Sequence, residues 1–371
     1  MRIERHSLPA DSLQAEHHVL SLHFGPAGAA RKVYIQAGLH ADELPGLLTA
    51  DHLRRRLQEA EQQAQICGEI VLVALANPLG LAQSLHGQPF GRFQFDNGIN
   101  FNRQFPLLAQ EVAASLEGQE LPADEAALLR LLRRQARELL LQGTRQNAAS
   151  QLKHILLALA IDADLVLDLH CDCQAVMHAY TSPQSAQAFA ALFAYSGARA
   201  VLTAQVSGGE PFDESCSRLW PELAQLLGRP LPQACHALTL ELRGQTDVSD
   251  ELAAQDAAAI CAFLQSEGIL LGAAPPLPPA HYAVTPLAGV EPLHAATPGV
   301  IVFDAEVGQM VQPGQLVAEI VDPVHGVRSP VRASIAGLLY ARTAQRYALR
   351  GMEIARIAGQ EARRAGDLLS A

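Results

Sequence analysis

The sequence is poor in positive charge and has no long apolar run. Lysine and arginine together number 27 against 38 aspartates and glutamates, which gives a net charge of −11. This balance argues against broad binding to nucleic acid or to an anionic membrane, because both call for a basic face. No uninterrupted apolar segment reaches the roughly 18 residues of a membrane-spanning helix, and residues 1–6 contain no apolar signal core.

Cysteine is also scarce, and its spacing shows no paired C-x-x-C framework. The six cysteines lie at positions 67, 171, 173, 216, 235 and 261. We therefore expect a cytoplasmic protein with reduced thiols. The composition, 49% hydrophobic and 18% charged, is that of a soluble globular protein. A chain of 371 residues is long enough for two domains, or for one large domain with an appendage.

Residues 1–272 alternate apolar runs with amphipathic stretches, which predicts a layered α/β domain. The expected strands are 32–37, 70–76, 165–169 and 238–242, and the expected helices are 46–63, 124–141, 148–160, 185–195 and 250–266. Each expected strand is a nearly continuous apolar run, which is typical of strands covered on both faces.

A proline-rich segment, 273–280, separates this domain from a C-terminal region with a different pattern of apolar residues. Such a segment cannot continue a helix and acts as a semi-rigid linker. Residues 281–371 show short apolar runs broken by glycine and proline, at 299–303, 308–311 and 314–320. The sequence therefore predicts a small C-terminal all-β domain.

Polar side chains follow the apolar runs at the points where strands should end. His40 and Glu43 come just after the run 33–35, and His170 closes the run 165–169. Because ligands bind outside the carboxyl ends of the strands in open α/β sheets, these side chains should meet. Two histidines and one carboxylate would make a three-ligand zinc site with an open position for water, although the set also suits cobalt or manganese.

Four further residues complete a hydrolytic set. Glu241, near the end of the run 238–242, could act as the general base. Arg92 could polarise a scissile carbonyl and stabilise the oxyanion. Asn102 and Arg103 could bind a substrate carboxylate, since a guanidinium can bond both of its oxygens.

The motifs that carry these residues resemble those of the succinylglutamate desuccinylase/aspartoacylase family of zinc carboxypeptidase-like proteins. The matching segments are Gly38-Leu39-His40-Ala41-Asp42-Glu43, Asn102-Arg103-Gln104-Phe105-Pro106, Asp168-Leu169-His170 and Thr239-Leu240-Glu241. The resemblance covers about residues 30–265. It implies a mixed, largely doubly wound sheet with helices on both faces, followed by a C-terminal domain similar to a biotinyl/lipoyl-type barrel.

The sequence departs from the family pattern at three places. Asn100 stands where the family often has aspartate, and Arg92 lies farther from the Asn-Arg pair than the oxyanion arginine usually does, which leaves Arg243 as an alternative. Cys171 and Asp172 follow His170 where small hydroxyl residues are common. The C-terminal domain contains no lysine, so it cannot carry biotin or lipoate; it would instead cover the catalytic domain, shape the pocket or form an oligomer contact.

Each residue also has an ordinary structural interpretation. His40, Glu43 and His170 could be polar residues at strand ends, and Glu241 could be a solvated carboxylate. Asp168 leaves the same strand face as His170 and could orient it, or could be a capping or core polar group. Cys171 should point to the opposite face, and Cys171 and Cys173 are better explained as free thiols than as ligands. His178 is best placed in the core or on the surface.

The sequence thus predicts a zinc-dependent amidohydrolase with one Zn²⁺ per chain, which removes an N-acyl group such as acetyl or succinyl from an amino acid or a related small amine. Its partner would be that small molecule, not a nucleic acid or a membrane, and a homo-oligomer is left open. Two alternatives are a metallocarboxypeptidase for short peptides and a non-catalytic binding protein on the same fold.

Overall fold

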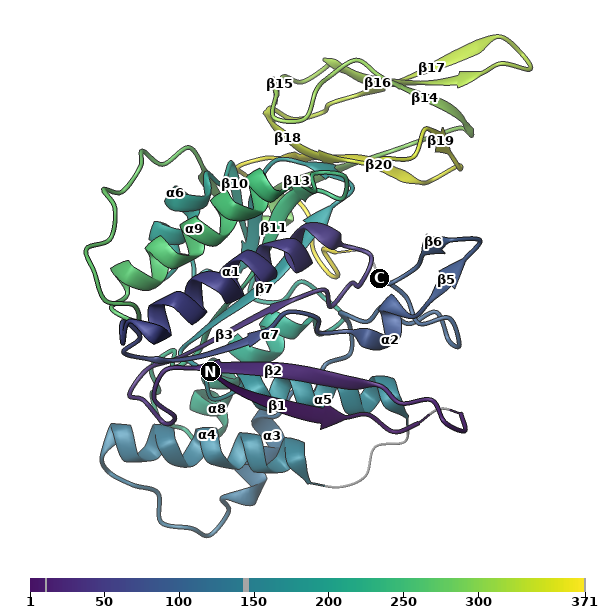
Figure 1. The fold of residues 1–371 in the computed structure, drawn as a ribbon. Helices are drawn as coiled ribbons and strands as arrows, with labels where there is room; N and C mark the ends of the chain where they lie inside the picture. The colour runs from purple at the N-terminus through teal and green to yellow at the C-terminus, as the bar shows by residue number, and fades with distance from the viewer. Residues whose placement is uncertain (11, 143–146, 370–371) are drawn as a thin grey trace.

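A large mixed sheet forms the centre of the molecule. The computed structural model describes residues 1–10, 12–142 and 147–369, with α/β layers below and a β module above in the view of Figure 1. Within those residues the sheet has the strand order β1-β2-β4-β3-β7-β11-β9-β10-β12. Its strands are β1 (Arg2–Ser7), β2 (His18–Phe24), β3 (Lys32–Ala37), β4 (Glu69–Val73), β7 (Leu165–Asp172), β9 (His178–Thr181), β10 (Ala200–Thr203), β11 (His236–Gly244) and β12 (Ala283–Pro286).

The neighbouring strands β4, β3, β7 and β11 are parallel to one another, and so are β9, β10 and β12. The pairs β1–β2, β2–β4 and β11–β9 are antiparallel. Parallel strands place their carboxyl ends on the same edge, so β3, β7 and β11 deliver their last residues to one region. The predicted α/β class with a large mixed sheet is therefore confirmed.

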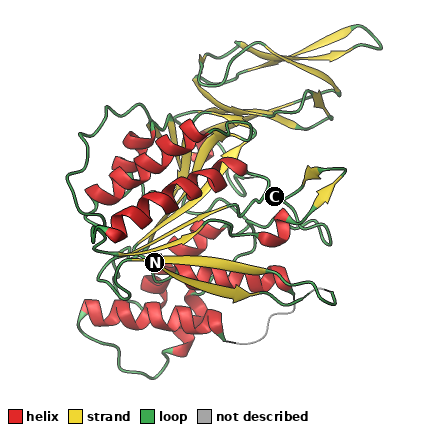
Figure 2. Cartoon of the chain, in the orientation of Figure 1, coloured by secondary structure: helices red, strands yellow, loops and turns green. Residues whose placement is uncertain are grey.

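Helices cover both faces of this sheet, as Figure 2 shows in red. One face carries α1 (Leu44–Gln62), α6 (Ala190–Ser196) and α9 (Asp250–Ser266), and the other carries α3 (Ala109–Ser115), α4 (Glu125–Leu141), α5 (Ala148–Ala160), α7 (Phe212–Ser217) and α8 (Leu219–Leu226). The short helix α2 (Pro78–Leu81) and the hairpin β5 (Ser84–Leu85) to β6 (Gln88–Pro89) project beside the sheet edge (Figure 1). Two apolar cores result, one on each face.

Sequence and structure agree best where the apolar period is strong. β3, α5 and α9 have the expected bounds, while β7 and β11 run two or three residues beyond the expected ends. The extension of β7, residues 170–172, lines a cavity, and that of β11 contains Arg243, which pairs with Asp256; an apolar pattern cannot detect either extension. α6 begins at Ala190 because residues 185–189 form a turn, in which the Ser182 hydroxyl accepts a hydrogen bond from the amide of Ser185.

The C-terminal module consists of two β-sheets around a shared apolar core (Figure 1). One sheet has the order β13 (Val290–His294), β20 (Glu353–Ala358), β18 (Gly337–Arg342), β15 (Met310–Val311), and the other β17 (Val327–Arg332), β16 (Leu316–Asp322), β14 (Gly299–Phe303), β19 (Tyr347–Ala348). A 3-10 turn, η1 (Leu287–Gly289), leads into it.

The linker 273–280 is not the point at which the two sheet systems separate. β12 follows this linker, yet it pairs with β10 in the main sheet. In the reverse direction, β8 (Gln174–Ala175), just after β7, pairs with β18 of the module. The module is thus joined to the main sheet by backbone hydrogen bonds, and its own strands begin at Val290.

All six cysteines are free thiols. In the described ranges no helix combines the length and the apolar character needed to cross a bilayer.

The central strand gives a test of this packing. Leu167 on β7 is fully buried, so Leu167→Ala should lower the free energy of unfolding by about 2–5 kcal/mol. The fluorescence of Trp220, the single tryptophan and itself buried, reports denaturant unfolding. Leu226→Ala, at a half-exposed position on α8, is the matched control and should cost far less. Equal losses in the two variants would contradict the placement of β7.

Candidate active site

The carboxyl ends of β3, β7 and β11 open into one cavity of about 280 Å³. Its charged and imidazole lining residues are His40, Glu43, Arg92, Arg103, His170, Asp172, Asp213, Glu214, Glu241 and Arg356. The structure therefore brings together all seven residues that the sequence singled out, since Asn102 lines the same cavity.

The loop that carries His40 is held by its neighbours. The side-chain amide of Asn77 donates to the carbonyl of Leu39, 2.9 Å away, and its oxygen caps α2 by accepting from the amide of Gly80. Gly91 lies so close to this loop that a Cβ there would sit 2.3 Å from the amide nitrogen of Asp42. Only glycine permits that approach, which places the next residue, Arg92, beside His40.

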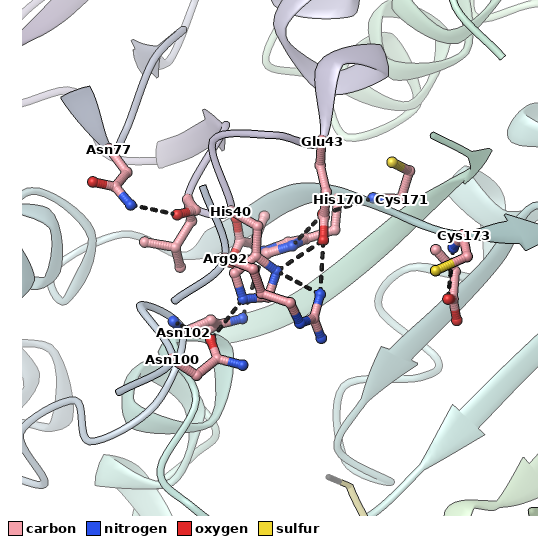
Figure 3. Close-up of polar contacts among 12 residues, drawn as sticks. His40, Glu43, Asn77, Arg92, Asn100, Asn102, His170, Cys171 and Cys173 are labelled. Carbon is pink, nitrogen blue, oxygen red and sulfur yellow. Dashed lines mark hydrogen bonds and ion pairs between the residues drawn. The ribbon is translucent and has the colours of Figure 1, made fainter. Parts of the chain in front are cut away.

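His40, Glu43 and His170 converge on one point, as Figure 3 shows. All three are buried, and one donor atom from each lies within 4.8 Å of the others. Nδ1 of His40 is 2.9 Å from Oε1 of Glu43, and Nδ1 of His170 is 2.9 Å from Oε2. The backbone amide of Cys171 donates to the same Oε2 at 3.0 Å.

The far side of each imidazole is held by an oxygen. Nε2 of His40 donates to Oδ1 of Asn100 at 2.7 Å, and Nε2 of His170 lies 2.9 Å from Oδ2 of Asp168. Asp168 is in turn fixed by the side-chain amide of Gln36, which donates to its other oxygen. These contacts place the proton on Nε2 and leave Nδ1 free to act as a ligand.

Burial and neighbouring charges shift the pKa values of the two histidines in opposite directions. Burial, together with the charge of Arg92, lowers the pKa of His40 to about 4. Burial alone would lower the pKa of His170 too, but the carboxylates of Asp168 and Glu43 on either side raise it well above its usual value. A lone-pair nitrogen, a carboxylate and a second imidazole aimed at one another are the donor set of a divalent metal, so these residues could hold such an ion.

Glu241 is brought beside His170 by strand register. In the parallel pair β11–β7, Thr239 is level with Asp168 and Glu241 with His170. Oε2 of Glu241 has no hydrogen bond within the described residues. Burial and then the negative charge of Glu43 raise the pKa of Glu241 to about 8. The carboxyl group is therefore poised to take up a proton near neutral pH.

Arg92 lies directly at the ligand cluster. Its Nη1 donates to Oε1 of Glu43 at 2.9 Å and to Nδ1 of His40 at 3.1 Å. Arg243, the alternative suggested by the sequence, is turned away: it forms two hydrogen bonds with the carboxylate of Asp256 on α9 and does not line the cavity. Of these two arginines, only Arg92 can act at the centre.

Asn102 and Arg103 line the cavity and also hold a loop over it. The side-chain oxygen of Asn102 accepts from the amide of Phe212 at 2.9 Å, and its nitrogen is 3.5 Å from Nε2 of His170. Nη1 of Arg103 donates to the carbonyl of Asn102. Burial and the charge of Arg92 lower the pKa of Arg103. The backbone amides of residues 104 and 105 also donate hydrogen bonds to the carbonyls of residues 209 and 210, which holds these two loops together.

Four charged residues of the cavity were not among the seven predicted site residues. Arg356 of the C-terminal module reaches the cavity and pairs with Asp172 at 3.2 Å. Asp213 and Glu214 come from the start of α7. Their sequence signal is weak, because Arg356 is one charged residue within an otherwise apolar stretch, 354–358, and Asp213 comes after a Gly-Gly-Glu-Pro-Phe segment without a recognisable motif. Asp172, two residues after His170 on β7, lines the same cavity.

The structure gives Cys171, Cys173 and His178 no place among the three potential metal ligands. Cys171 and Cys173 border the cavity, but neither sulfur belongs to the three-donor cluster found among the described residues. His178 is fully buried, packs against the rings of Tyr180 and Tyr340, and has its pKa lowered to about 4 by burial.

Known proteins resemble this chain in sequence and in fold. The family model described as "Succinylglutamate desuccinylase/Aspartoacylase catalytic domain" matches residues 29–266. No curated protein matches the chain.

Two solved structures illustrate the likeness in fold. A succinylglutamate desuccinylase/aspartoacylase family protein of Shewanella amazonensis superposes with a TM-score of 0.85 at 24% identity, over 96% of this chain and 98% of the other. The product-bound ectoine utilization protein EutE of Ruegeria pomeroyi superposes with a TM-score of 0.65 at 19% identity, over 97% and 95% of the two chains. At these identities the likeness shows the fold alone.

The contact between Asp168 and His170 gives a test of the metal site. Asp168→Asn should weaken metal binding about 10- to 100-fold, because an amide cannot accept from both His170 and Gln36. Titration against a chromophoric chelator measures the affinity. Asp250→Asn, at an exposed aspartate paired with His52, is the control and should leave the affinity unchanged. Unchanged affinity in Asp168→Asn would rule out this orienting role.

Proposed function

Because the chain belongs to the succinylglutamate desuccinylase/aspartoacylase family, we propose that it is a zinc-dependent amidohydrolase. It would remove an N-acyl group, such as acetyl or succinyl, from an amino acid or a related small amine. The observation that carries this proposal is the convergence of His40, Glu43 and His170 beside Glu241 in one cavity.

The donor set suits zinc. Two imidazole nitrogens and one carboxylate are the ligands of hydrolytic zinc sites, and the contacts of Asn100 and Asp168 hold both imidazoles in the ligating orientation. When bound, the ion supplies Lewis-acid activation of a water molecule and of the scissile carbonyl.

The chain's own residues handle the proton and the charge. Glu241 accepts a proton from the attacking water as the carbon–oxygen bond forms, then delivers it to the amine nitrogen as the carbon–nitrogen bond breaks. Arg92, at the ligand cluster, offers its guanidinium to the developing negative charge on the carbonyl oxygen. Arg103, with Asn102, is the proposed binding group for a substrate carboxylate.

The surroundings of the cavity favour a small substrate. A space of about 280 Å³ suits an acylated amino acid better than a longer peptide. The C-terminal module, which we propose to be a barrel-like domain without a carrier function, contributes Arg356 to the wall. A cytoplasmic location and a division into a hydrolase domain, residues 1–272, and a β-rich domain, residues 281–371, are parts of the same proposal, with β12 of the second part adding a strand to the main sheet.

A substrate panel tests the reaction. Zinc-loaded protein should release amine from N-acetyl and N-succinyl amino acids at least about tenfold more efficiently than from dipeptides, measured as kcat/KM with a ninhydrin or fluorescamine readout. Faster cleavage of dipeptides would instead identify a carboxypeptidase. Metal-loaded protein that cleaves none of these amides would support a binding protein.

A substitution of Glu241, the proposed general base, separates the loss of turnover from the loss of bound zinc. Glu241→Gln should keep bound zinc and lower kcat by about 100-fold or more, because the amide cannot take up a proton. His170→Ala is the complementary variant and should lose the metal. Near-normal turnover in Glu241→Gln, or full zinc occupancy in His170→Ala, would refute the respective assignments.

The same residue sets the acid limb of the pH profile. Glu241 must be ionised to accept a proton, and its pKa is raised, so kcat/KM should fall as the pH decreases through that pKa. The midpoint should lie above the ordinary 4.5 and not above about 8, since a bound cation opposes the effect of burial. Stopped assays from pH 4 to 9 locate it.

A further inference from the structure

The chain returns to the candidate active site after the last strand of the C-terminal module. β20 ends at Ala358, and residues 359–369 form no helix or strand. In Figure 1 this yellow segment leaves the module and runs down beside the main sheet. Its Leu369 lines the cavity that contains the three potential metal ligands. Residues 360–369 are called the strap below.

Backbone hydrogen bonds attach the strap to the rest of the molecule at two places. The amides of residues 363–364 both donate to the carbonyl of Ala288, at 2.9 Å. Farther along the strap, the amides of Leu368 and Leu369 share the carbonyl of Ser207, at 2.8 and 3.3 Å. The second attachment therefore fixes the end of the strap that reaches the cavity.

The loop that receives this end is itself held firmly. Ser207 lines the cavity, and its amide donates to Oε1 of Glu214 at 2.7 Å. Its neighbour Gly208 lies so close to the strap that a Cβ there would be 2.5 Å from Oδ1 of Asp367. Farther along the loop, two carbonyls accept hydrogen bonds from the segment that follows Arg103. Of the two partners in this contact, the strap is the one with fewer attachments.

The apolar contacts of the strap are also limited. Leu368 and Leu369 pack against a small apolar cluster that includes Leu202 and Leu287, two residues of the cavity wall. Both leucines of the strap are only partly buried, and residues 365–367 beside them are exposed. A segment with few buried contacts and an exposed backbone opens at a much lower cost than the core does.

We propose that the strap is a gate, which covers one side of the candidate active-site cavity and moves away when a ligand enters or leaves. Gly366, between the two attachments, has a φ of 81° and can absorb the change in backbone direction that this movement needs. The inference goes beyond the proposed function, because it concerns access to the cavity and applies to any small ligand that binds there.

Thiol labelling measures this access directly. Ala204 lines the cavity and is partly buried, so Ala204→Cys places a reporter thiol in its wall. In this background, Leu368→Ala combined with Leu369→Ala should speed the reaction of the introduced thiol with N-ethylmaleimide by about 10-fold, because the open form becomes more populated. Peptide mass spectrometry follows each cysteine separately.

Two natural cysteines serve as internal standards. Cys67 is exposed and should react at the same rate in every variant, whereas Cys216 is buried and should stay protected while the fold is intact. Leu349→Ala, at an exposed leucine of the module, is the matched control and should leave the labelling rate of the reporter unchanged. Equal reporter rates with and without the two strap leucines would overturn the proposal.

A milder variant decides the case in which the double substitution unfolds the protein, which labelling of Cys216 would reveal. Nη2 of Arg364 donates to the carbonyl of Leu368 at 3.0 Å and so braces the end of the strap. Arg364→Ala should speed labelling of the reporter by about 2- to 10-fold, the effect of one lost hydrogen bond, with Cys216 still protected. An unchanged reporter rate in this variant would refute the gate.

Turnover distinguishes a gate from a fixed wall. Release of the strap should raise kcat/KM of the zinc-loaded protein for N-acetyl amino acids by about 10-fold, because the closed form no longer lowers the apparent affinity. A fall in kcat/KM despite faster labelling would show that the strap positions the substrate, and would overturn the gate. If no variant cleaves any amide, the proposed function fails, and the labelling rates still decide the role of the strap.

Discussion

The carboxylate of Glu43 is the contact on which the candidate site depends. Its Oε1 faces His40 and Arg92, and its Oε2 faces His170 and the backbone amide of Cys171. One short side chain therefore ties the loop after β3 to the end of β7. Because Glu43 directly precedes α1, the start of that helix, the loop and the strand must pack closely, and Gly46 allows it: a Cβ there would lie 3.0 Å from the carbonyl of Leu169.

The register between β7 and β11 sets the positions of His170 and Glu241 relative to each other. β7 and β11 are parallel neighbours whose residues align as Asp168 with Thr239 and His170 with Glu241. Side chains at level positions on adjacent parallel strands leave the same face, so a ligand histidine and the proposed base reach the cavity together. A shift of one residue in this pairing would turn Glu241 to the apolar side of the sheet.

The C-terminal module is part of this arrangement, not an appendage beside it. β8 begins two residues after the end of β7 and hydrogen-bonds to β18, and the amide of Val176 donates to the carbonyl of Tyr340. β20, the neighbour of β18, carries Arg356 into the cavity. Backbone pairing between β8, β18 and β20 therefore holds Arg356 in the wall of the cavity that contains His40, Glu43 and His170.

By itself the sequence determined the α/β class, the strong helices and strands, and the set of seven residues in the cavity. Apolar periodicity is local, and the motifs of His40, Asn102, His170 and Glu241 are short, so both can be read along the chain. The antiparallel strand pair β1–β2 was not predicted from the sequence, because β1 is largely exposed and has no continuous apolar run.

Only the tertiary structure decided which side chains these residues meet. In the fold Arg243 pairs with Asp256, and Arg92 lies beside His40 and Glu43. Arg356 and Asp213 reach the same cavity from segments far away in the sequence. Nothing local marks such residues, because their surroundings come from strand pairing and loop packing between distant segments. The physical reason is that burial and charge pairing depend on neighbours in space, whereas the sequence gives order only along the chain.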